Sequence, residues 1–251
     1  MRQCVRQGQA ACLRLPHAVG WSAVAWQALV RCPAVLRALT ALALAYASFD
    51  AAAWDRDVML RAAQAQGPHA VAGARALQAV LVSAAAQDDA HRLVAINRFF
   101  NSRIVFTSDM EVWGEEDHWA SPLEMLGKGR GDCEDYVIGK YFSLIAAGTL
   151  PSRLRLVYVR ATLGQIGQPG ASILAHMVLA YSVAPGDDPL ILDNLITDIR
   201  PASRRPDLAP VFSFNAEGLW QGVSGRSAGD PLARLSRWRE LLARVRSEGF
   251  Q

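Results

Sequence analysis

The spacing of apolar side chains changes once along the chain, from a helical period to a strand period. Before residue 150 apolar positions recur about every 3.6 residues, which is typical of helices that bury one face. This pattern predicts helices over 56–66, 76–101 and 132–147. Later the period is two, with β-branched and aromatic residues enriched, which predicts strands over 154–159, 173–183 and 190–192. With a final amphipathic helix, this order indicates an α+β fold, N-terminal helices packed on an antiparallel sheet around one core.

Cap and turn residues set several of these boundaries. Asp132 is placed to cap the start of helix 132–147 with help from Asp135, and Gly148 is placed to cap its end. The stretch 186–189 (GDDP) predicts the turn of an antiparallel hairpin.

Two stretches lack a clear period, and one helix closes the chain. Residues 104–128 are aromatic, acidic and turn-rich, so we predict an irregular segment there. Residues 201–230 are predicted to be loop-like with short extended pieces. The last helix is predicted over 231–247. Its expected buried face consists of Leu232, Leu235, Trp238, Leu241, Leu242 and Val245.

The first 53 residues have the character of an export signal. Arginines precede a ten-residue apolar run over 38–47, and small-x-small patterns follow at 45–47 and 51–53. The run is too short to span a bilayer of about 30 Å as a helix. We therefore predict a cleaved signal peptide, with a mature N-terminus between Ser48 and Trp54. The alternatives are an uncleaved amphipathic anchor and a buried helix of the domain. A natural start codon nearer Val30 would explain why the sequence ahead of the apolar run is unusually long for a signal peptide.

Removal of this segment changes the charge and the cysteine count. The net charge of +3 belongs to residues 1–53, because residues 54–251 hold 21 basic and 22 acidic side chains. Nothing in the remainder indicates nucleic acid binding. Three of the four cysteines lie in the segment, which leaves Cys133 alone in an oxidising compartment.

Cys133 is the first candidate for chemistry. It lies in the predicted first turn of a helix, where unpaired backbone N–H groups favour a thiolate, the nucleophilic form of cysteine. Many cysteines are inert packing residues. We favour a functional role because Cys133 is the single remaining cysteine and lies among glycines and carboxylates.

A nucleophilic cysteine needs a base, and His176 is the best placed histidine. It lies within a predicted strand whose hairpin returns Asp193 close to it, so the carboxylate can orient the imidazole. His118 remains a second candidate, whereas His69 and His91 lie in polar surroundings typical of the surface.

Three carboxylates flank the thiol, at Asp132, Glu134 and Asp135. They could simply cap the helix, or they could hold a hard cation, for which calcium suits oxygen donors better than zinc does. The residues alone leave both readings open. A zinc site on Cys133 and His176 is rejected because no further ligands stand at a usual spacing.

Several motifs, in order, resemble the bacterial transglutaminase-like cysteine peptidases of the LapG type. The resemblance covers residues 90 to 220, and its motifs are 119–124 (WASPLE), 131–136 (GDCEDY), 140–141 (KY), 175–179 (AHMVL), 192–195 (LDNL), 204–215 (RRPDLAPVFSFN) and 218–220 (GLW). One departure is Gly139, where the family more often has alanine, and which costs about 1 kcal/mol of helix stability.

The resemblance implies a papain-like fold and a calcium-dependent cysteine endopeptidase of the periplasm. Such enzymes cleave the N-terminal region of a large cell-surface adhesin at a paired-alanine site, which releases the adhesin and disperses biofilm. The periplasmic domain of an inner-membrane cyclic di-GMP receptor sequesters them. The family's triad carries over to Cys133, His176 and Asp193, and its calcium ligands to Asp132 and Glu134, with Asp135 as a weaker candidate.

Two other functions fit the same residues. The triad could catalyse transglutamination or amide hydrolysis. Assays that compare hydrolysis with transfer to an added amine acceptor would distinguish these reactions. A non-catalytic, calcium-dependent binding module on the same fold is the alternative from another class.

Overall fold

Residues 54–103, where the described part of the chain begins, form three helices rather than the two expected. The computed structural model describes residues 54–166, 168–184, 186–222 and 229–251, so the predicted signal peptide over 1–53 lies outside the described residues. Helix α3 (Arg56–Gln66) has the predicted bounds. The predicted helix 76–101 is wrong as a single element, because α4 (Pro68–Ala85) ends and α5 (Asp89–Arg103) begins within it. Asp88 makes this break, since its side chain accepts a hydrogen bond from the backbone of His91 at 2.9 Å.

The segment predicted to be irregular contains short regular elements. These are β1 (Val105–Phe106), α6 (Asp109–Trp113), α7 (Pro122–Lys128) and β2 (Arg130–Gly131). A capping box starts α7: the Ser121 side chain accepts from the backbone of Glu124, whose carboxylate accepts from the backbone of Ser121. Strands β1 and β2 pair in parallel, with Phe106 opposite Gly131. This pairing brings the start of α6 beside the start of the helix that follows β2.

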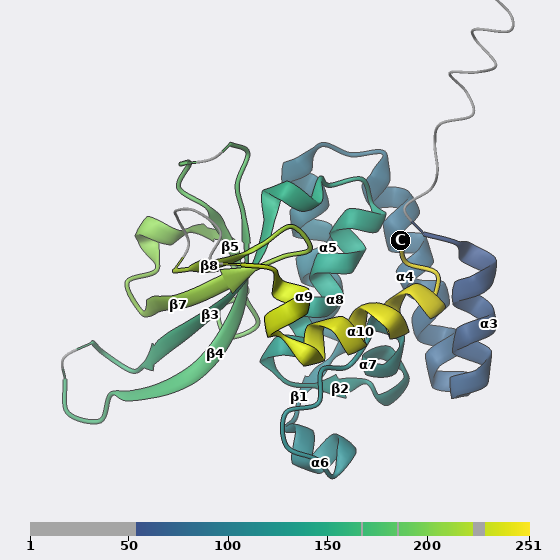
Figure 1. The fold of residues 1–251 in the computed structure, drawn as a ribbon, viewed down its shortest axis with the longest axis horizontal. Helices are drawn as coiled ribbons and strands as arrows, with labels where there is room; N and C mark the ends of the chain where they lie inside the picture. Colours follow the sequence, from purple (N-terminus) through teal and green to yellow (C-terminus); the bar gives the residue numbers. More distant parts are fainter. Residues whose placement is uncertain (1–53, 167, 185, 223–228) are drawn as a thin grey trace, which may run out of the picture. The chain divides into compact units, whose positions relative to one another are not determined.

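Helix α8 (Cys133–Ala146) lies between the other helices and the sheet. Its start is the predicted one, with Asp132 as N-cap. Its end differs slightly, because Ala147 is the C-cap and Gly148, with φ +97°, is the residue after it. Nearly all of its residues are buried, since α5, α7 and the sheet cover different sides of it (Figure 1).

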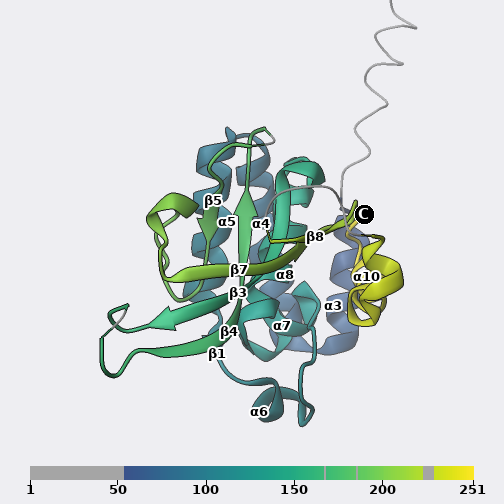
Figure 2. The same ribbon diagram turned by 60° about the vertical axis from the view of Figure 1, so that its left-hand side comes forward.

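The sheet has six strands, and its pairing is not a simple meander. The strands are β3 (Leu154–Leu163), β4 (Ser172–Tyr181), β5 (Leu190–Leu192), β6 (Arg200–Pro201), β7 (Leu208–Phe214) and β8 (Leu219–Gln221). Their order is β6-β5-β4-β3-β7-β8, so β7 returns to pair with β3. The predicted antiparallel hairpin of β4 and β5 is confirmed. The helices α4, α5 and α8 lie on one side of the sheet, and the β3–β4 hairpin extends away from them (Figures 1 and 2).

The C-terminal helix predicted over 231–247 is divided at Leu235 into α9 (Pro231–Arg234) and α10 (Ser236–Ser247). Trp238, Leu241 and Val245 are buried as predicted, whereas Leu232 is exposed. Beyond α10, the buried Glu248 accepts hydrogen bonds from the hydroxyl of Ser121 and the backbone of Leu123. The end of the chain is thereby attached to the start of α7.

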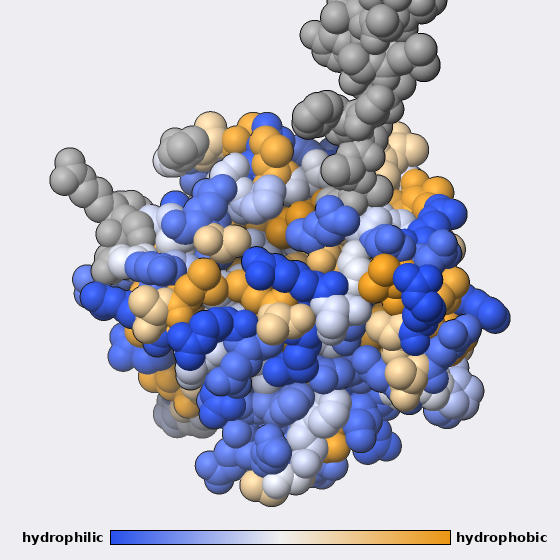
Figure 3. All heavy atoms as spheres, turned by 45° about the vertical axis from the view of Figure 1, so that its right-hand side comes forward, coloured by the Kyte–Doolittle hydropathy of each residue, from blue (hydrophilic) through white to orange (hydrophobic). Residues whose placement is uncertain are grey.

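The described residues share one main hydrophobic core, which agrees with the predicted α+β class. A smaller cluster lies across β3, β4 and β5 around Val157, Val178 and Ile191. The surface in Figure 3 is largely hydrophilic with scattered apolar patches. Within the part of the chain that the structure describes, none of the helices has both the length and the apolar character needed to cross a membrane.

Candidate active site

Cys133 is the first residue of α8, and the loop before it is built around Asp135. One oxygen of the buried Asp135 carboxylate accepts from the backbone of Ala120 at 2.7 Å, and the other from the backbone of Asp132 at 3.3 Å. A Cβ on Gly131 would lie 2.7 Å from Asp135 Oδ2, so glycine is required there. These contacts fix the start of the helix, and with it the position of the thiol.

His176 and Asp193 lie close together, as predicted from the hairpin that connects their strands. Leu179 on β4 is paired with Leu192 on β5, so the next residue, Asp193, leaves the sheet toward the side chain of His176. Nε2 of His176 lies 2.8 Å from Asp193 Oδ1, and both side chains are buried. The carboxylate therefore contacts Nε2, which leaves Nδ1 as the ring nitrogen for proton transfer.

Asp193 has a second charged partner, Arg205, for which the sequence predicts no role. Arg205 Nη2 donates to Asp193 Oδ2 at 2.7 Å, and the guanidinium is buried. Burial raises the pKa of Asp193, but the hydrogen bond and charge of His176 and the bond from Arg205 outweigh it and lower the pKa to about 2. The side chain of Asn101 on α5 donates to the Asp193 carbonyl at 2.7 Å. Asp193 is thus held ionised and in place.

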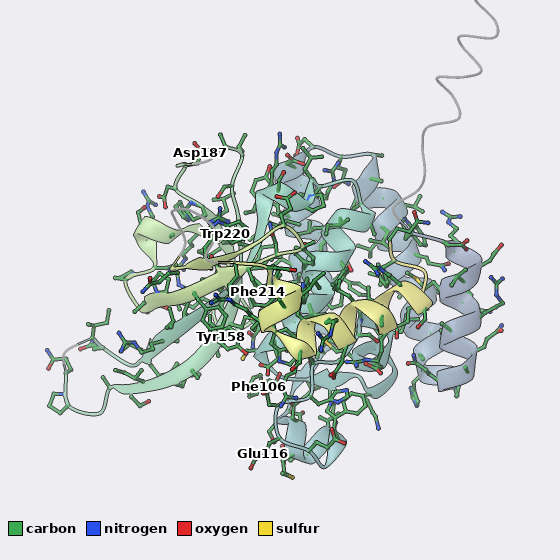
Figure 4. All side chains as sticks on the ribbon, viewed as in Figure 1. Phe106, Glu116, Tyr158, Asp187, Phe214 and Trp220 are labelled. Atoms are coloured by element: carbon green, nitrogen blue, oxygen red, sulfur yellow. The ribbon has the colours of Figure 1, made fainter. Side chains whose placement is uncertain are left out.

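Cys133 and His176 line one cleft with a volume of about 430 Å³. Apolar side chains from four segments form much of its wall: Phe106, Met110, Leu174 and Leu195. Tyr158, on β3, also lines it, and in Figure 4 Tyr158, Phe106 and Glu116 follow one another down the same side of the molecule. The structure therefore brings the three predicted triad residues to one place.

The Cys133 thiol faces carboxylates. Sγ donates a hydrogen bond to Glu134 Oε2 at 3.0 Å. The backbone N–H of Met177 on β4 forms a hydrogen bond with the sulfur. Burial, followed by the negative charges of Glu134 and Asp132, raises the pKa of the thiol. This direction is opposite to the one expected from the helix start alone, because burial and, after it, the carboxylates outweigh the favourable effect of the helix start.

A cluster of acids beside the thiol has the properties of a cation site. Oxygens of Asp109, Asp132 and Asp135 lie within 4.8 Å of one another. An oxygen of Glu134, an oxygen of Asp132 and Sγ of Cys133 form a second group within the same distance. Oδ1 of Asp109 and Oδ1 of Asp132 are buried without a hydrogen-bond partner. Burial raises the pKa of Asp109 to about 6, and burial with the charges of Glu134 and Asp135 raises the pKa of Asp132. Buried, unpartnered carboxylate oxygens at this spacing fit a hard cation such as calcium.

Asp109 is the member of this cluster that the sequence did not predict. It begins α6, and the parallel pairing of β1 with β2 carries it to the start of α8. Asp135 belongs to one of the acidic groups and also assists the start of α8 as predicted, because its two oxygens accept backbone hydrogen bonds. In the described part of the chain no histidine joins either acidic group.

His118, the second candidate for the base, is not among the residues that line the cleft. Its ring stacks on Trp113 with 4.3 Å between centroids, and its nearest carboxylate oxygens, on Glu115 and Glu124, are 3.7 and 3.9 Å away. His91 is exposed as predicted and pairs with Asp88. The geometry therefore favours His176 as the base.

The comparison with known families decides the class of this site. The pattern of the bacterial transglutaminase-like cysteine proteinases (BTLCP) matches residues 71–207, more than half of the chain. The chain belongs to this family. The chain is therefore a cysteine peptidase, as the motifs predicted, and the matched range contains Cys133, His176 and Asp193. No curated protein sequence matches the chain significantly.

Solved structures agree with this assignment. LapG from Legionella pneumophila after EGTA treatment is 35% identical, with a TM-score of 0.65, over 76% of this chain and 97% of that one. Its calcium-bound structure is also 35% identical, with a TM-score of 0.64, over 76% and 99% of the two chains. The predicted transglutaminase-like, single-domain fold is confirmed.

Proposed function

We propose that this protein is a calcium-dependent cysteine endopeptidase of the periplasm that cleaves a large cell-surface adhesin. The observation that carries the proposal is the composition of one cleft. It contains a thiol at a helix start, a histidine hydrogen-bonded to a buried carboxylate, and acids with unpartnered oxygens beside the thiol.

The triad residues have distinct roles in this proposal. Cys133 Sγ attacks the scissile carbonyl carbon after its proton passes to His176. His176 then protonates the leaving amine. Asp193, at 2.8 Å from Nε2, fixes the ring so that Nδ1 faces the reaction, and Arg205 keeps that carboxylate ionised.

Calcium would be held by Asp109, Asp132 and Glu134, because Asp132 belongs both to the acidic group of Asp109 and to the group that Glu134 forms with the thiol. The calcium-bound LapG structure supports this choice of metal. When bound, the ion supplies positive charge that neutralises the acids next to Cys133. Asp135 holds the backbone of Asp132 and so orients the cluster.

The substrate, control and location are proposed from the family resemblance. The apolar walls of the cleft suit a segment with small uncharged side chains, such as a paired-alanine site in the N-terminal region of an adhesin. Release of the adhesin would disperse biofilm, and the periplasmic domain of a cyclic di-GMP receptor in the inner membrane would inhibit the enzyme. The signal-like residues 1–53 support export to the periplasm.

The direct test is incubation of the purified protein with an adhesin N-terminal fragment. We expect one cut at a paired-alanine site with calcium, none in excess EGTA, and none with Cys133→Ala in either condition. Cleavage that persists in EGTA would contradict the calcium dependence. Amine incorporation without cleavage, when an acceptor amine is added, would indicate transglutamination instead.

A further inference from the structure

Peptide cleavage by Cys133 requires hydrogen-bond donors that the triad itself does not supply. When the Sγ–C bond forms, the carbonyl π electrons move onto oxygen, and this oxyanion needs donors until the C–N bond breaks. The backbone N–H of Cys133, at the start of α8, is suitably placed for one of them. A second donor must come from the wall of the cleft.

Elimination among the cleft-lining side chains leaves one candidate. Four of them carry a donor: Ser108, Cys133, Tyr158 and His176. Cys133 and His176 are the nucleophile and the base. The hydroxyl of Ser108 donates to Glu111 at 3.3 Å. The Tyr158 hydroxyl is unused, since no group among the described residues forms a hydrogen bond with it.

The sheet places Tyr158 beside the thiol. Tyr158 on β3 is directly opposite Met177 on β4, and the Met177 backbone N–H acts on Cys133 Sγ. Tyr158 and Cys133 also pack against the same hydrophobic core, so both side chains lie on the α8 face of the sheet. Figure 4 shows Tyr158 and Phe106, both of which line the cleft, on the same side of the molecule.

The ring of Tyr158 is held in one orientation. It stacks on Phe212 of β7 with 4.6 Å between centroids and 28° between planes. A donor fixed in this way loses little entropy when the oxyanion forms, which is the property that makes oxyanion holes effective.

We propose that the Tyr158 hydroxyl is the second oxyanion donor of this peptidase, an inference that rests on the proposed function. The hydroxyl donates a hydrogen bond to the oxyanion and keeps its proton throughout. The tetrahedral species collapses when the carbonyl re-forms, and the C–N electrons leave with the amine, which takes its proton from His176. Burial, with the charge of Glu134, raises the pKa of Tyr158, so the hydroxyl stays protonated.

The test uses Tyr158→Phe and two reagents that differ in their need for an oxyanion hole. The aldehyde acetyl-Ala-Ala-al forms a hemithioacetal whose oxygen requires the donors, whereas alkylation by iodoacetamide forms no oxyanion. With calcium present, we expect the variant to bind the aldehyde about 10²-fold more weakly, the loss typical of one donor. We expect its alkylation rate and melting temperature to match those of the wild type, because the stacked ring is kept.

Tyr181→Phe is the matched control, since it removes a hydroxyl from the same sheet that bonds to Asp89 outside the cleft. It should bind the aldehyde as the wild type does. An aldehyde affinity of Tyr158→Phe equal to that of the wild type would overturn the inference. An alkylation rate that falls together with the aldehyde affinity would also overturn it, because the hydroxyl would then act on the reactivity of the thiol. A wild type that is not alkylated at Cys133 would contradict the proposed function as well.

Discussion

At the scale of single residues, Asp193 shows how strongly a buried carboxylate depends on its partners. Its pKa of about 2 lies below the ordinary value of 3.8. Because the folded pKa is the lower one, the ionised group stabilises the fold above about pH 4, and this contribution is lost as the pH falls toward 2. His176 lowers this pKa most, and Arg205 lowers it further, since its guanidinium is buried against Asp193.

Arg205→Met should therefore raise the pKa of Asp193 and weaken the protein. Removing one partner of a buried ion pair costs about 3–5 kcal/mol, and the acid unfolding transition should begin at a higher pH than in the wild type. Urea unfolding between pH 3 and 7 measures both effects. Arg204→Met, at the exposed neighbouring position, is the control and should change little. Identical acid transitions for the two variants would contradict this account of Asp193.

Asp109→Asn tests the acid that the sequence did not predict. If its unpartnered oxygen is a calcium ligand, the variant should bind calcium at least about tenfold more weakly, because a charged ligand is lost. Calorimetric titration of the purified protein measures this. Glu116→Gln is the control, since Glu116 lines the same cleft but belongs to neither acidic group. Equal affinity in Asp109→Asn and the wild type would remove Asp109 from the site.

The residues that could be predicted are those whose neighbours in sequence reveal them. Cys133 follows a glycine break and begins a helix, and Asp193 follows a strand that returns beside His176. Asp109 gave no such signal, because its position depends on β1 and β2, which pair over only two residues each. Arg205 lies in a loop, and only the folded chain shows that its side chain is buried against Asp193.

At the scale of elements, Gly139 in α8 reverses an expectation drawn from the sequence. Helix propensity alone predicts that Gly139→Ala stabilises the protein by about 1 kcal/mol. However, a Cβ there would lie 2.7 Å from both the ring of Phe100 and the end of Met125. We expect a net loss of about 1–3 kcal/mol, since an overfilled core must shift. Thermal unfolding measures this, and Phe100→Leu in the same background should recover part of the loss. A raised melting temperature for Gly139→Ala would contradict the packing.

Glu248 makes the attachment of the chain end to α7 dependent on pH. Burial outweighs its hydrogen bonds and raises its pKa from 4.5 to about 7. The folded state thus binds this proton more tightly, so the stability that the protonated group provides is complete below pH 4.5 and is lost as the pH rises toward 7. Glu248→Gln should flatten the decline in melting temperature between pH 5 and 8. The decline that it removes corresponds to up to about 3 kcal/mol in free energy of unfolding. Glu240→Gln, on the exposed side of α10, should follow the wild type. Parallel curves for all three proteins would contradict the role of Glu248.

The elements themselves were predictable where local signals were strong. Helices α3 and α8 and the strands β4 and β5 follow periodicity and caps that the sequence displays. The break at Asp88 and the pairing of β7 with β3 were not predicted. An N-cap within a long apolar pattern is easily read as helix interior, and the strand order depends on contacts between distant segments.

At the scale of the whole molecule, the site exists because separate layers meet at the start of α8. The sheet brings the backbone of Met177 to the thiol, and the paired β1 and β2 bring Asp109 to the acids. Burial and the same acids that would hold a cation raise the pKa of Cys133, so neutralising the acids would make the thiol a better nucleophile. We therefore expect calcium binding and catalysis to be coupled through this cluster.

The rate of alkylation of Cys133 by iodoacetamide at pH 7, followed by mass spectrometry of the peptide that contains it, tests this coupling most directly. We predict that calcium increases the rate at least about tenfold over excess EGTA, because a fall of one unit in the thiol pKa raises the thiolate fraction by that factor. Replacement of Asp132 by Asn and Glu134 by Gln together should abolish the response to calcium. Equal rates for the wild type in calcium and in EGTA would contradict the account.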